Sequence, residues 1–444
     1  MEESKKLLDK HTDEYWRCAR CSLCKWPPLA QIKSAKFSSI CCSMDYGYFH
    51  PWSGGGKIVI GASLYYDRVK VTEEVRDTIL QCTLCGACDA SCKYSTDLEV
   101  LDTIFDVRQH VVEKIGPHPA HKKYADAAEK YNNPYGEPHE NRQEWINKTS
   151  AKSNPNSKTL FFTGCTASYR QQDMAQASVE ILNAIDYEFQ VSMDEICCGS
   201  PIYRSGQVGT SKKYIQSNIE LFNRLGIEEI ITACPGCYAM FVAEYPHQLD
   251  ETHFEMWKKI KFRHMVEIIE EAIRKKNIEF EESDKKPIIT YHDPCHLGRG
   301  AEPYVSEWKG TKKKVYNQIT VYDPPKIYRR GGKGVYDAPR NIFKRMNKTL
   351  EFVEMFRINE YAYCCGSGGG VKAAYPEMAM LAATNRLEEA EFVLNEASKE
   401  KNVEKIIVSA CPFCKTNFEN GLLEAGKDIQ YKDINQLVLE LMKK

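Results

Sequence analysis

The sequence predicts an α/β protein in which a mainly helical, cysteine-rich domain precedes a pseudo-twofold pair of parallel-sheet domains. Three observations lead to this prediction. Short β-branched apolar runs alternate with helical patterns after residue 158, a five-cysteine pattern occurs twice in that part of the chain, and two more cysteine runs lie before residue 100. Strands that alternate with helices build parallel sheets whose faces are covered by the helices.

The composition of the 444-residue chain fits about two to four globular domains. Apolar residues make up 43% and charged residues 27%, which excludes a mainly disordered chain. The net charge is −1, so we expect no general attraction to nucleic acid or to anionic membranes. No apolar run approaches the ~20 residues of a transmembrane helix, and the first residues lack the apolar core of a secretory signal. We therefore expect a cytoplasmic protein, which a partner could hold at the cytoplasmic face of the membrane.

Nineteen cysteines are the most informative feature of the composition. An odd number argues against a closed disulfide framework, and a chain of this length does not need disulfides for stability. In a reducing compartment, clustered thiolates usually bind metal. The spacing of the cysteines therefore indicates which metal they bind.

The first domain, expected over residues 1–115, contains a run with the spacing C-x2-C-x2-C-x3-C. This run consists of Cys82, Cys85, Cys88 and Cys92. In bacterial ferredoxins the first three cysteines of such a run ligate one cubane 4Fe–4S cluster, and the fourth ligates a second cluster. We therefore expect a helical ferredoxin-like domain with two cubane clusters.

A second run repeats the triplet without a cysteine at the usual fourth position. It consists of Cys18, Cys21 and Cys24. We expect Cys41 to be the missing ligand and Cys42 to take the place of the proline that follows it in ferredoxins. Crossed ligation then gives one set of Cys18, Cys21, Cys24 and Cys92, and another of Cys82, Cys85, Cys88 and Cys41. Zinc sites are the alternative. Zinc takes four ligands as two pairs, however, and a C-x2-C-x2-C triplet would supply one cysteine too many on one side of such a site.

The rest of the chain repeats a pattern of one cysteine, then CCG, then C-P-x-C. A polar stretch over 116–157 is expected to be a linker, and the repeats define domains over 158–286 and 287–444. The first five-cysteine set consists of Cys165, Cys197, Cys198, Cys234 and Cys237. The second five-cysteine set consists of Cys295, Cys364, Cys365, Cys411 and Cys414.

Each C-P-x-C motif follows a β-branched apolar run, EEIITA in the first repeat and EKIIVSA in the second. Such runs are typical of buried parallel strands. Each motif should then lie at the C-terminal end of a strand and the start of a helix. Helix N-termini favour anionic thiolates, so this position suits a metal ligand.

The second repeat contains an insertion. Only 31 residues separate Cys165 from Cys197, but 68 separate Cys295 from Cys364. A segment over 301–333 accounts for the excess, and its removal leaves 35 residues. It carries eight basic against three acidic residues, interleaved with aromatic side chains, and such a stretch could bind nucleic acid. In a neutral protein we instead expect a solvated surface loop, and a docking surface for an acidic partner is the intermediate interpretation.

The doubled pattern C-x31-CCG-x34-C-P-x-C resembles the paired CCG domains of heterodisulfide reductases. Behind a two-cluster ferredoxin segment, it resembles the D subunit of that family and the related iron–sulfur subunits that work with membrane cytochromes, flavoproteins and acyl-CoA-linked complexes. The resemblance covers residues 15–100 and 158–430. It implies a noncubane 4Fe–4S cluster on each five-cysteine set, in addition to the two cubane clusters. In the disulfide-reducing members, the two noncubane clusters face each other and cleave a disulfide between them.

Adjacent cysteines suit a multi-iron cluster, because neighbouring side chains in extended backbone point to opposite sides. A cluster can take both sulfurs on different irons, whereas one tetrahedral ion cannot easily do so. We expect Cys198 and Cys365, the second cysteines of the CCG motifs, to be catalytic. The competing possibility is that one half holds an ordinary cubane and leaves its fifth thiolate idle.

Two histidines, His292 and His296, flank Cys295 in the sequence H-D-P-C-H. As catalytic residues they would donate protons to a thiolate that leaves a cluster, since histidine titrates near neutrality. The alternative, which we favour, is that they are structural residues at a strand end, held by backbone hydrogen bonds.

These features predict an iron–sulfur oxidoreductase of anaerobic metabolism. Electrons would pass from two cubane clusters to two noncubane clusters for heterodisulfide-reductase-like disulfide and thiol chemistry. The alternative is a non-catalytic electron-transfer subunit that links a flavoprotein or membrane cytochrome to another redox enzyme. The resemblance implies redox partner subunits, namely a flavoprotein, an electron-transfer protein or a membrane cytochrome b, and a disulfide or thiol as substrate.

Overall fold

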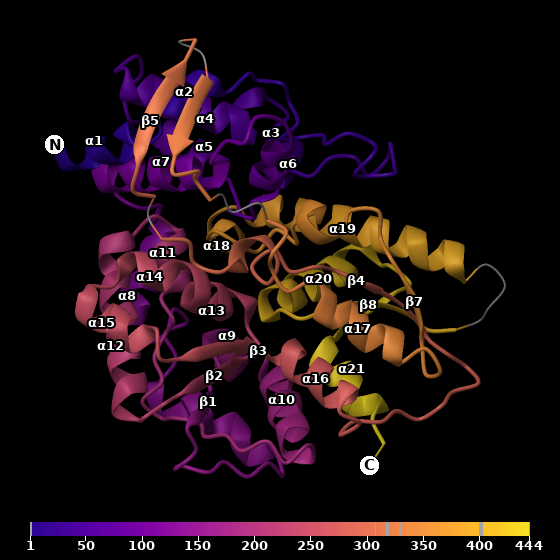
Figure 1. Ribbon diagram of the computed structural model, residues 1–444. Helices are drawn as coiled ribbons and strands as arrows, with labels where there is room; N and C mark the ends of the chain where they lie inside the picture. The colour runs from indigo at the N-terminus through magenta and orange to yellow at the C-terminus, as the bar shows by residue number, and fades with distance from the viewer. Residues whose placement is uncertain (1, 307, 317–318, 328–330, 399–402, 444) are drawn as a thin grey trace.

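The computed structural model describes residues 2–306, 308–316, 319–327, 331–398 and 403–443. Figure 1 shows a helical region that lies across the upper ends of two α/β domains. Within the described ranges, no helix is both long and apolar enough to cross a membrane.

The first 115 residues form the predicted helical domain. Its helices are α1 (Glu2–Asp9), α2 (Thr12–Arg17), α3 (Cys42–Gly47), η1 (His50–Trp52), α4 (Gly54–Tyr65), α5 (Glu73–Leu80), α6 (Ala87–Ser95) and α7 (Val100–Ile115). Helix α7 is central, because it packs against α1, α4 and α5 through buried residues such as Ile104, Val107 and Val111. The first cysteine run lies in the loop between α2 and α3, and the run from Cys82 to Cys92 begins in the loop after α5 and extends into α6.

Residues 116–157 differ from the polar linker that the sequence suggested. They contain α8 (Pro119–Tyr131) and the 3-10 helix η2 (His139–Lys148). Trp145 is fully buried in the core of the first α/β domain. The composition was misleading because polar residues of this segment, such as Arg142 and Gln143, are buried and hydrogen-bonded inside the protein rather than hydrated.

The first α/β domain contains a three-stranded parallel sheet with the order β1-β2-β3. The strands are β1 (Thr159–Phe161), β2 (Glu229–Thr232) and β3 (Lys261–His264). An isolated parallel bridge between Leu160 and Gln190 extends the sheet beyond β1. The helices are α9 (Cys165–Tyr169), α10 (Gln172–Ala184), α11 (Ser200–Arg204), α12 (Val208–Arg224), α13 (Pro235–Ala239), the π-helix η3 (Met240–Glu244), α14 (Tyr245–Gln248), α15 (Glu251–Trp257) and α16 (Met265–Arg274).

The second α/β domain contains a four-stranded parallel sheet with the order β7-β4-β8-β9. The strands are β4 (Ile288–Tyr291), β7 (Glu351–Val353), β8 (Lys405–Ser409) and β9 (Gln430–Asp433). The helices are η4 (Arg299–Ala301), α17 (Asp337–Arg345), η5 (Asn359–Tyr361), α18 (Val371–Ala374), α19 (Pro376–Ala397), α20 (Pro412–Ala425) and α21 (Ile434–Leu441). The bridge at Gln190 flanks β1 in the first sheet just as β7 flanks β4 in the second. If it is counted as a strand, both domains have the same strand order. The predicted parallel sheets are confirmed.

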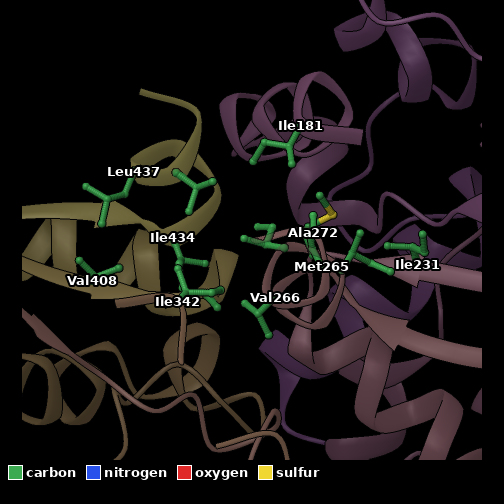
Figure 2. Packing of buried hydrophobic residues seen from close by; sticks show 14 of the residues in the cluster. Ile181, Ile231, Met265, Val266, Ala272, Ile342, Val408, Ile434 and Leu437 are labelled. Atoms are coloured by element: carbon green, nitrogen blue, oxygen red, sulfur yellow. The ribbon is translucent and has the colours of Figure 1, made fainter. Parts of the chain in front are cut away.

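One hydrophobic core joins the two α/β domains. Helix α10 packs against α21, and α16 packs against α17. Figure 2 shows Met265 and Val266 of the first domain close to Ile342 and Ile434 of the second, and all four are fully buried. Burial of this continuous apolar surface favours a fixed orientation of the two domains.

The insertion forms an antiparallel hairpin of β5 (Thr311–Val315) and β6 (Ile319–Asp323). It is a regular element rather than a loop, but β5 is exposed along its whole length, as expected for a solvated surface segment. The hairpin reaches the helical domain, where Lys312 Nζ lies 3.1 Å from Asp13 Oδ2 and the Tyr322 hydroxyl donates to the same oxygen at 3.2 Å. Figure 1 shows it lying over that domain. Part of its basic character therefore serves a contact within the chain.

Candidate metal centres

Five cysteines of the helical domain line one cavity beside α3 and α4. They are Cys41, Cys42, Cys82, Cys85 and Cys88. Gly54 makes room for them, because a Cβ atom there would lie 2.8 Å from the Cβ of Cys88. Burial raises the pKa of Cys41 to about 12 and the pKa of Cys88 well above its usual value. Buried thiolates at this place need a positive partner, and four of the five thiols are enough for a cubane 4Fe–4S cluster.

The other triplet converges on the start of α4. The backbone N–H of Gly55 donates to Cys24 Sγ at 3.4 Å, and a Cβ atom at Gly55 would lie 3.7 Å from Cys18 Sγ. Cys92 belongs to the same buried cluster as Cys18, whereas Cys21 is exposed. Cys82 and Cys88 also pack against this cluster, so the assignment of Cys92 to this triplet stays a prediction.

The five cysteines of the first set are all buried at the C-terminal edge of the first sheet. Cys234 follows β2 and caps α13, as predicted for the C-P-x-C motif. Hydrogen bonds from the Cys197 and Cys237 thiols lower the pKa of Cys198 to about 6. Gly199 has a φ of 84°, and its N–H donates to Cys197 Sγ at 3.4 Å, so the CCG motif needs a glycine for this turn.

The second five-cysteine set repeats this construction, and all of its members are buried. Cys411 follows β8 and caps α20. The Sγ atoms of Cys365 and Cys414 are 3.3 Å apart. Gly366 has a φ of 94°, and its N–H donates to Cys364 Sγ at 3.3 Å. Several buried thiolates that no cation neutralises are unfavourable, so both sets suit a multi-iron cluster once their cysteines are deprotonated.

Cys364 lies where the second α/β domain meets the helical domain. Hydrogen bonds from Cys295 and Cys365, which belong to its own set, lower the pKa of Cys364 well below the usual value. Cys42 and Cys85 of the helical domain lower it further. Cys42, which the spacing leaves without a cluster, packs in the same buried group as Cys295 and Cys364. The second five-cysteine set therefore lies next to the cavity that Cys85 lines.

Phe413 lies between the two five-cysteine sets, and the sequence did not single it out. Its ring packs against the buried group around Cys237 and against the one around Cys414. The equivalent residue of the first C-P-x-C motif is Gly236, whose Cβ would lie 4.0 Å from the ring. The sequence did contain a clue to this role, because the third residue of the C-P-x-C motif is glycine in the first repeat and phenylalanine in the second.

The two histidines have different partners. The His292 ring accepts at Nδ1 from Arg386 Nε at 3.1 Å, and one of its ring nitrogens lies within 4.8 Å of the sulfurs of Cys365 and Cys414. The His296 ring hydrogen-bonds the backbone of Leu84. Burial lowers both pKa values well below the usual range. The expected backbone hydrogen bond is therefore found for His296. The ring of His292 is held instead by the side chain of Arg386.

Comparison with known proteins points to one family. The chain matches the family model "Cysteine-rich domain" (CCG) over residues 159–242 and 319–419. The D subunit of dihydromethanophenazine:CoB–CoM heterodisulfide reductase from Methanosarcina acetivorans is 31% identical over 83% of this chain and 79% of its own length. The B subunit of fumarate reductase (CoM/CoB) from Methanothermobacter marburgensis is 28% identical over 82% of this chain and 62% of its own length. EtfAB:quinone oxidoreductase from Syntrophomonas wolfei is 26% identical over 86% of this chain and 48% of its own length.

Proposed function

Because the chain belongs to the family of the heterodisulfide reductase D subunit, with two CCG domains, we propose that it is an oxidoreductase for disulfide and thiol redox chemistry. Electrons would enter at two cubane clusters and reach two noncubane clusters. When bound, these clusters supply centres that accept and release electrons one at a time. The chain's own residues hold them, keep water away and position the two halves.

The proposed ligands are those expected from the spacing. The cubane ligands are Cys18, Cys21, Cys24 and Cys92 on one cluster and Cys41, Cys82, Cys85 and Cys88 on the other. Each noncubane cluster is held by one five-cysteine set. Support comes from the shared cavity of the second cubane set and from the burial of all ten CCG cysteines.

The contact of Cys364 with Cys85 carries the proposal. These residues belong to different domains and to different ligand sets, yet Cys85 packs against the buried group that contains Cys364, and its thiol helps to lower the pKa of Cys364. An electron at the Cys85 cluster would therefore need to cross only a short distance to the second five-cysteine set. A scaffold that held the two kinds of site for structural reasons alone would not need them to touch.

The proposed reaction takes two electrons. Reduction of a disulfide RS–SR′ breaks the sulfur–sulfur bond, consumes two electrons and two protons, and releases RSH and R′SH. The two five-cysteine sets lie on either side of Phe413, so each half would receive one sulfur of the substrate. Cys198 and Cys365 are the proposed catalytic cysteines, with His292 and His296 beside the second set.

The test is a thiol titration of the oxidised, anaerobically reconstituted protein, followed by EPR spectroscopy. We expect signals that appear only with thiol and that are lost separately in Cys198→Ala and Cys365→Ala. Cys42→Ala is the matched control, because that residue is a buried cysteine outside both sets, and its signals should remain. Metal analysis that finds zinc and no iron would overturn the proposal.

A second candidate is an electron-transfer subunit without substrate chemistry. The relative named EtfAB:quinone oxidoreductase favours it, and so does the Phe413 ring, which occupies space between the two halves. In this case a flavoprotein, an electron-transfer protein or a membrane cytochrome b would be the partner. Full reduction by such a partner, together with no thiol-dependent signal, would support this function and exclude the first.

A further inference from the structure

The two five-cysteine sites differ at one equivalent position. Phe162 and His292 each follow the first strand of their sheet and precede the first cysteine of their set by three residues. Their backbone N–H groups donate at 2.8 Å to equivalent strands, at Ile231 O and Val408 O respectively. Both side chains are buried. The same position therefore carries an apolar ring in the first half and an imidazole in the second.

A buried charged pair holds the imidazole. Arg386 Nε donates to His292 Nδ1 at 3.1 Å, and Arg386 Nη1 donates to Glu389 Oε2 at 2.5 Å. Arg357 also donates to Glu389, and all three partners are almost completely buried. A guanidinium is always protonated, so Nδ1 must accept and the ring hydrogen must lie on Nε2.

This tautomer decides what the ring can do. A metal-ligating Nε2 would require the proton on Nδ1, where it would oppose the donor of Arg386. The Nε2–H group is instead a donor, and it is buried without a hydrogen-bond partner among the described residues. The ring is within 4.8 Å of the sulfurs of Cys365 and Cys414, which are acceptors if they bind a cluster.

We propose that His292 is a positioning residue which donates from Nε2–H to a sulfur of the cluster on the second five-cysteine set. Hydrogen bonds to cluster sulfurs stabilise the reduced form and raise the reduction potential. Phe162 offers no such donor to the first set. The two noncubane clusters are then unequal, and the second, which also adjoins the Cys85 cavity, is reduced first. This inference rests on the proposed function, because it requires a cluster in each set.

The test compares reduction potentials rather than turnover. His292→Phe copies the first half and removes the donor, whereas His292→Asn keeps an N–H group. Redox titrations of the reconstituted holoprotein, monitored by EPR, should show two noncubane midpoints in the wild type. His292→Phe should move the higher midpoint to lower potential, with unchanged iron and sulfide content. His292→Asn should retain part of the difference.

The control is Phe162→Leu, which alters the equivalent site without adding a donor and should leave the higher midpoint unchanged. Unaltered midpoints in fully loaded His292→Phe would overturn the inference. So would loss of the cluster from both His292 variants, because the ring would then be a ligand or a structural support. A wild-type protein without noncubane signals would instead contradict the proposed function.

Discussion

A hydrogen bond of 2.9 Å from Arg108 Nη1 to the carbonyl oxygen of Gly369 joins helix α7 to the glycine run of the second α/β domain. The same guanidinium donates to the carbonyl oxygen of Arg204 in the first α/β domain at 2.7 Å and to that of Ile79 at 3.1 Å. Arg108 is fully buried. One side chain of the helical domain therefore connects all three domains close to the cysteine clusters.

We predict that Arg108→Met lowers the free energy of unfolding by about 3 kcal/mol or more, because several buried carbonyl groups lose their donor at ~1–3 kcal/mol each. Anaerobic thermal and denaturant unfolding measures the change. Arg224→Met is the control, since its guanidinium is exposed and pairs with Asp194, and it should cost less than about 1 kcal/mol. Equal stability of the two variants would refute a joining role for Arg108.

The adjacent cysteines at the start of α3 should differ in their effect on iron. Both line the cavity with the ferredoxin-type triplet, but Cys42 packs against Cys295 and Cys364 of the second five-cysteine set. Cys41→Ala should therefore lose about one cluster, or roughly four irons per chain. Cys42 is the first residue of α3, where proline is tolerated, so Cys42→Pro and Cys42→Ala should keep their iron. Iron and sulfide analysis decides, and loss of iron only from the Cys42 variants would reverse the ligand assignment.

The hairpin can be removed at a defined base. Trp308 Nε1 donates to Pro324 O at 2.8 Å, whereas the first residues of the insertion, Ala301 and Glu302, are buried. We predict that replacing residues 309–323 by a short glycine–serine linker leaves iron content unchanged. The stability loss should stay near 1 kcal/mol, because the ion pair with Asp13 is partly exposed.

Electron exchange with the native partner gives the second measurement on this variant. An unchanged rate would exclude the hairpin as a docking surface for an acidic partner. A large loss of iron would instead show that the hairpin supports the clusters. Asp13→Asn is the matched control, because it removes the charged contact and keeps the hairpin.

Asp433 should make stability depend on pH. Burial raises its pKa to about 7, and its Oδ1 accepts from the N–H of Asn435 at the start of α21. The unfolded value is near 3.9, so the folded state binds the proton more tightly. The resulting stabilisation is complete below about pH 4 and is lost as the pH rises through about 7.

Asp433→Asn keeps a capping acceptor and removes the ionisation. We therefore expect the melting temperature of the variant, relative to wild type, to increase from about pH 4 to about pH 7 and to level off at higher pH. Asp428→Asn is the control, because that carboxylate is exposed and bonded to Lys405, and its loss should give no such gain. A difference between Asp433→Asn and wild type that did not change with pH would contradict the raised pKa.

Local patterns in the sequence were sufficient for the fold class and for the grouping of the cysteines. The β-branched runs before the two C-P-x-C motifs predicted buried parallel strands, which β2 and β8 confirm. Each motif then begins a helix, at Cys234 and Cys411. These features follow from residue spacing and periodicity, which short stretches of chain carry without reference to the rest.

Only the tertiary structure decided how these groups meet. The thiol of Cys364 contacts Cys85, Phe413 lies between the two halves, and Arg386 sets the tautomer of His292. The polar stretch 116–157 proved to be packed for the same reason, since the partners of its buried side chains come from elsewhere in the chain. Such contacts join residues that are far apart in sequence, and they depend on packing, which no local pattern encodes.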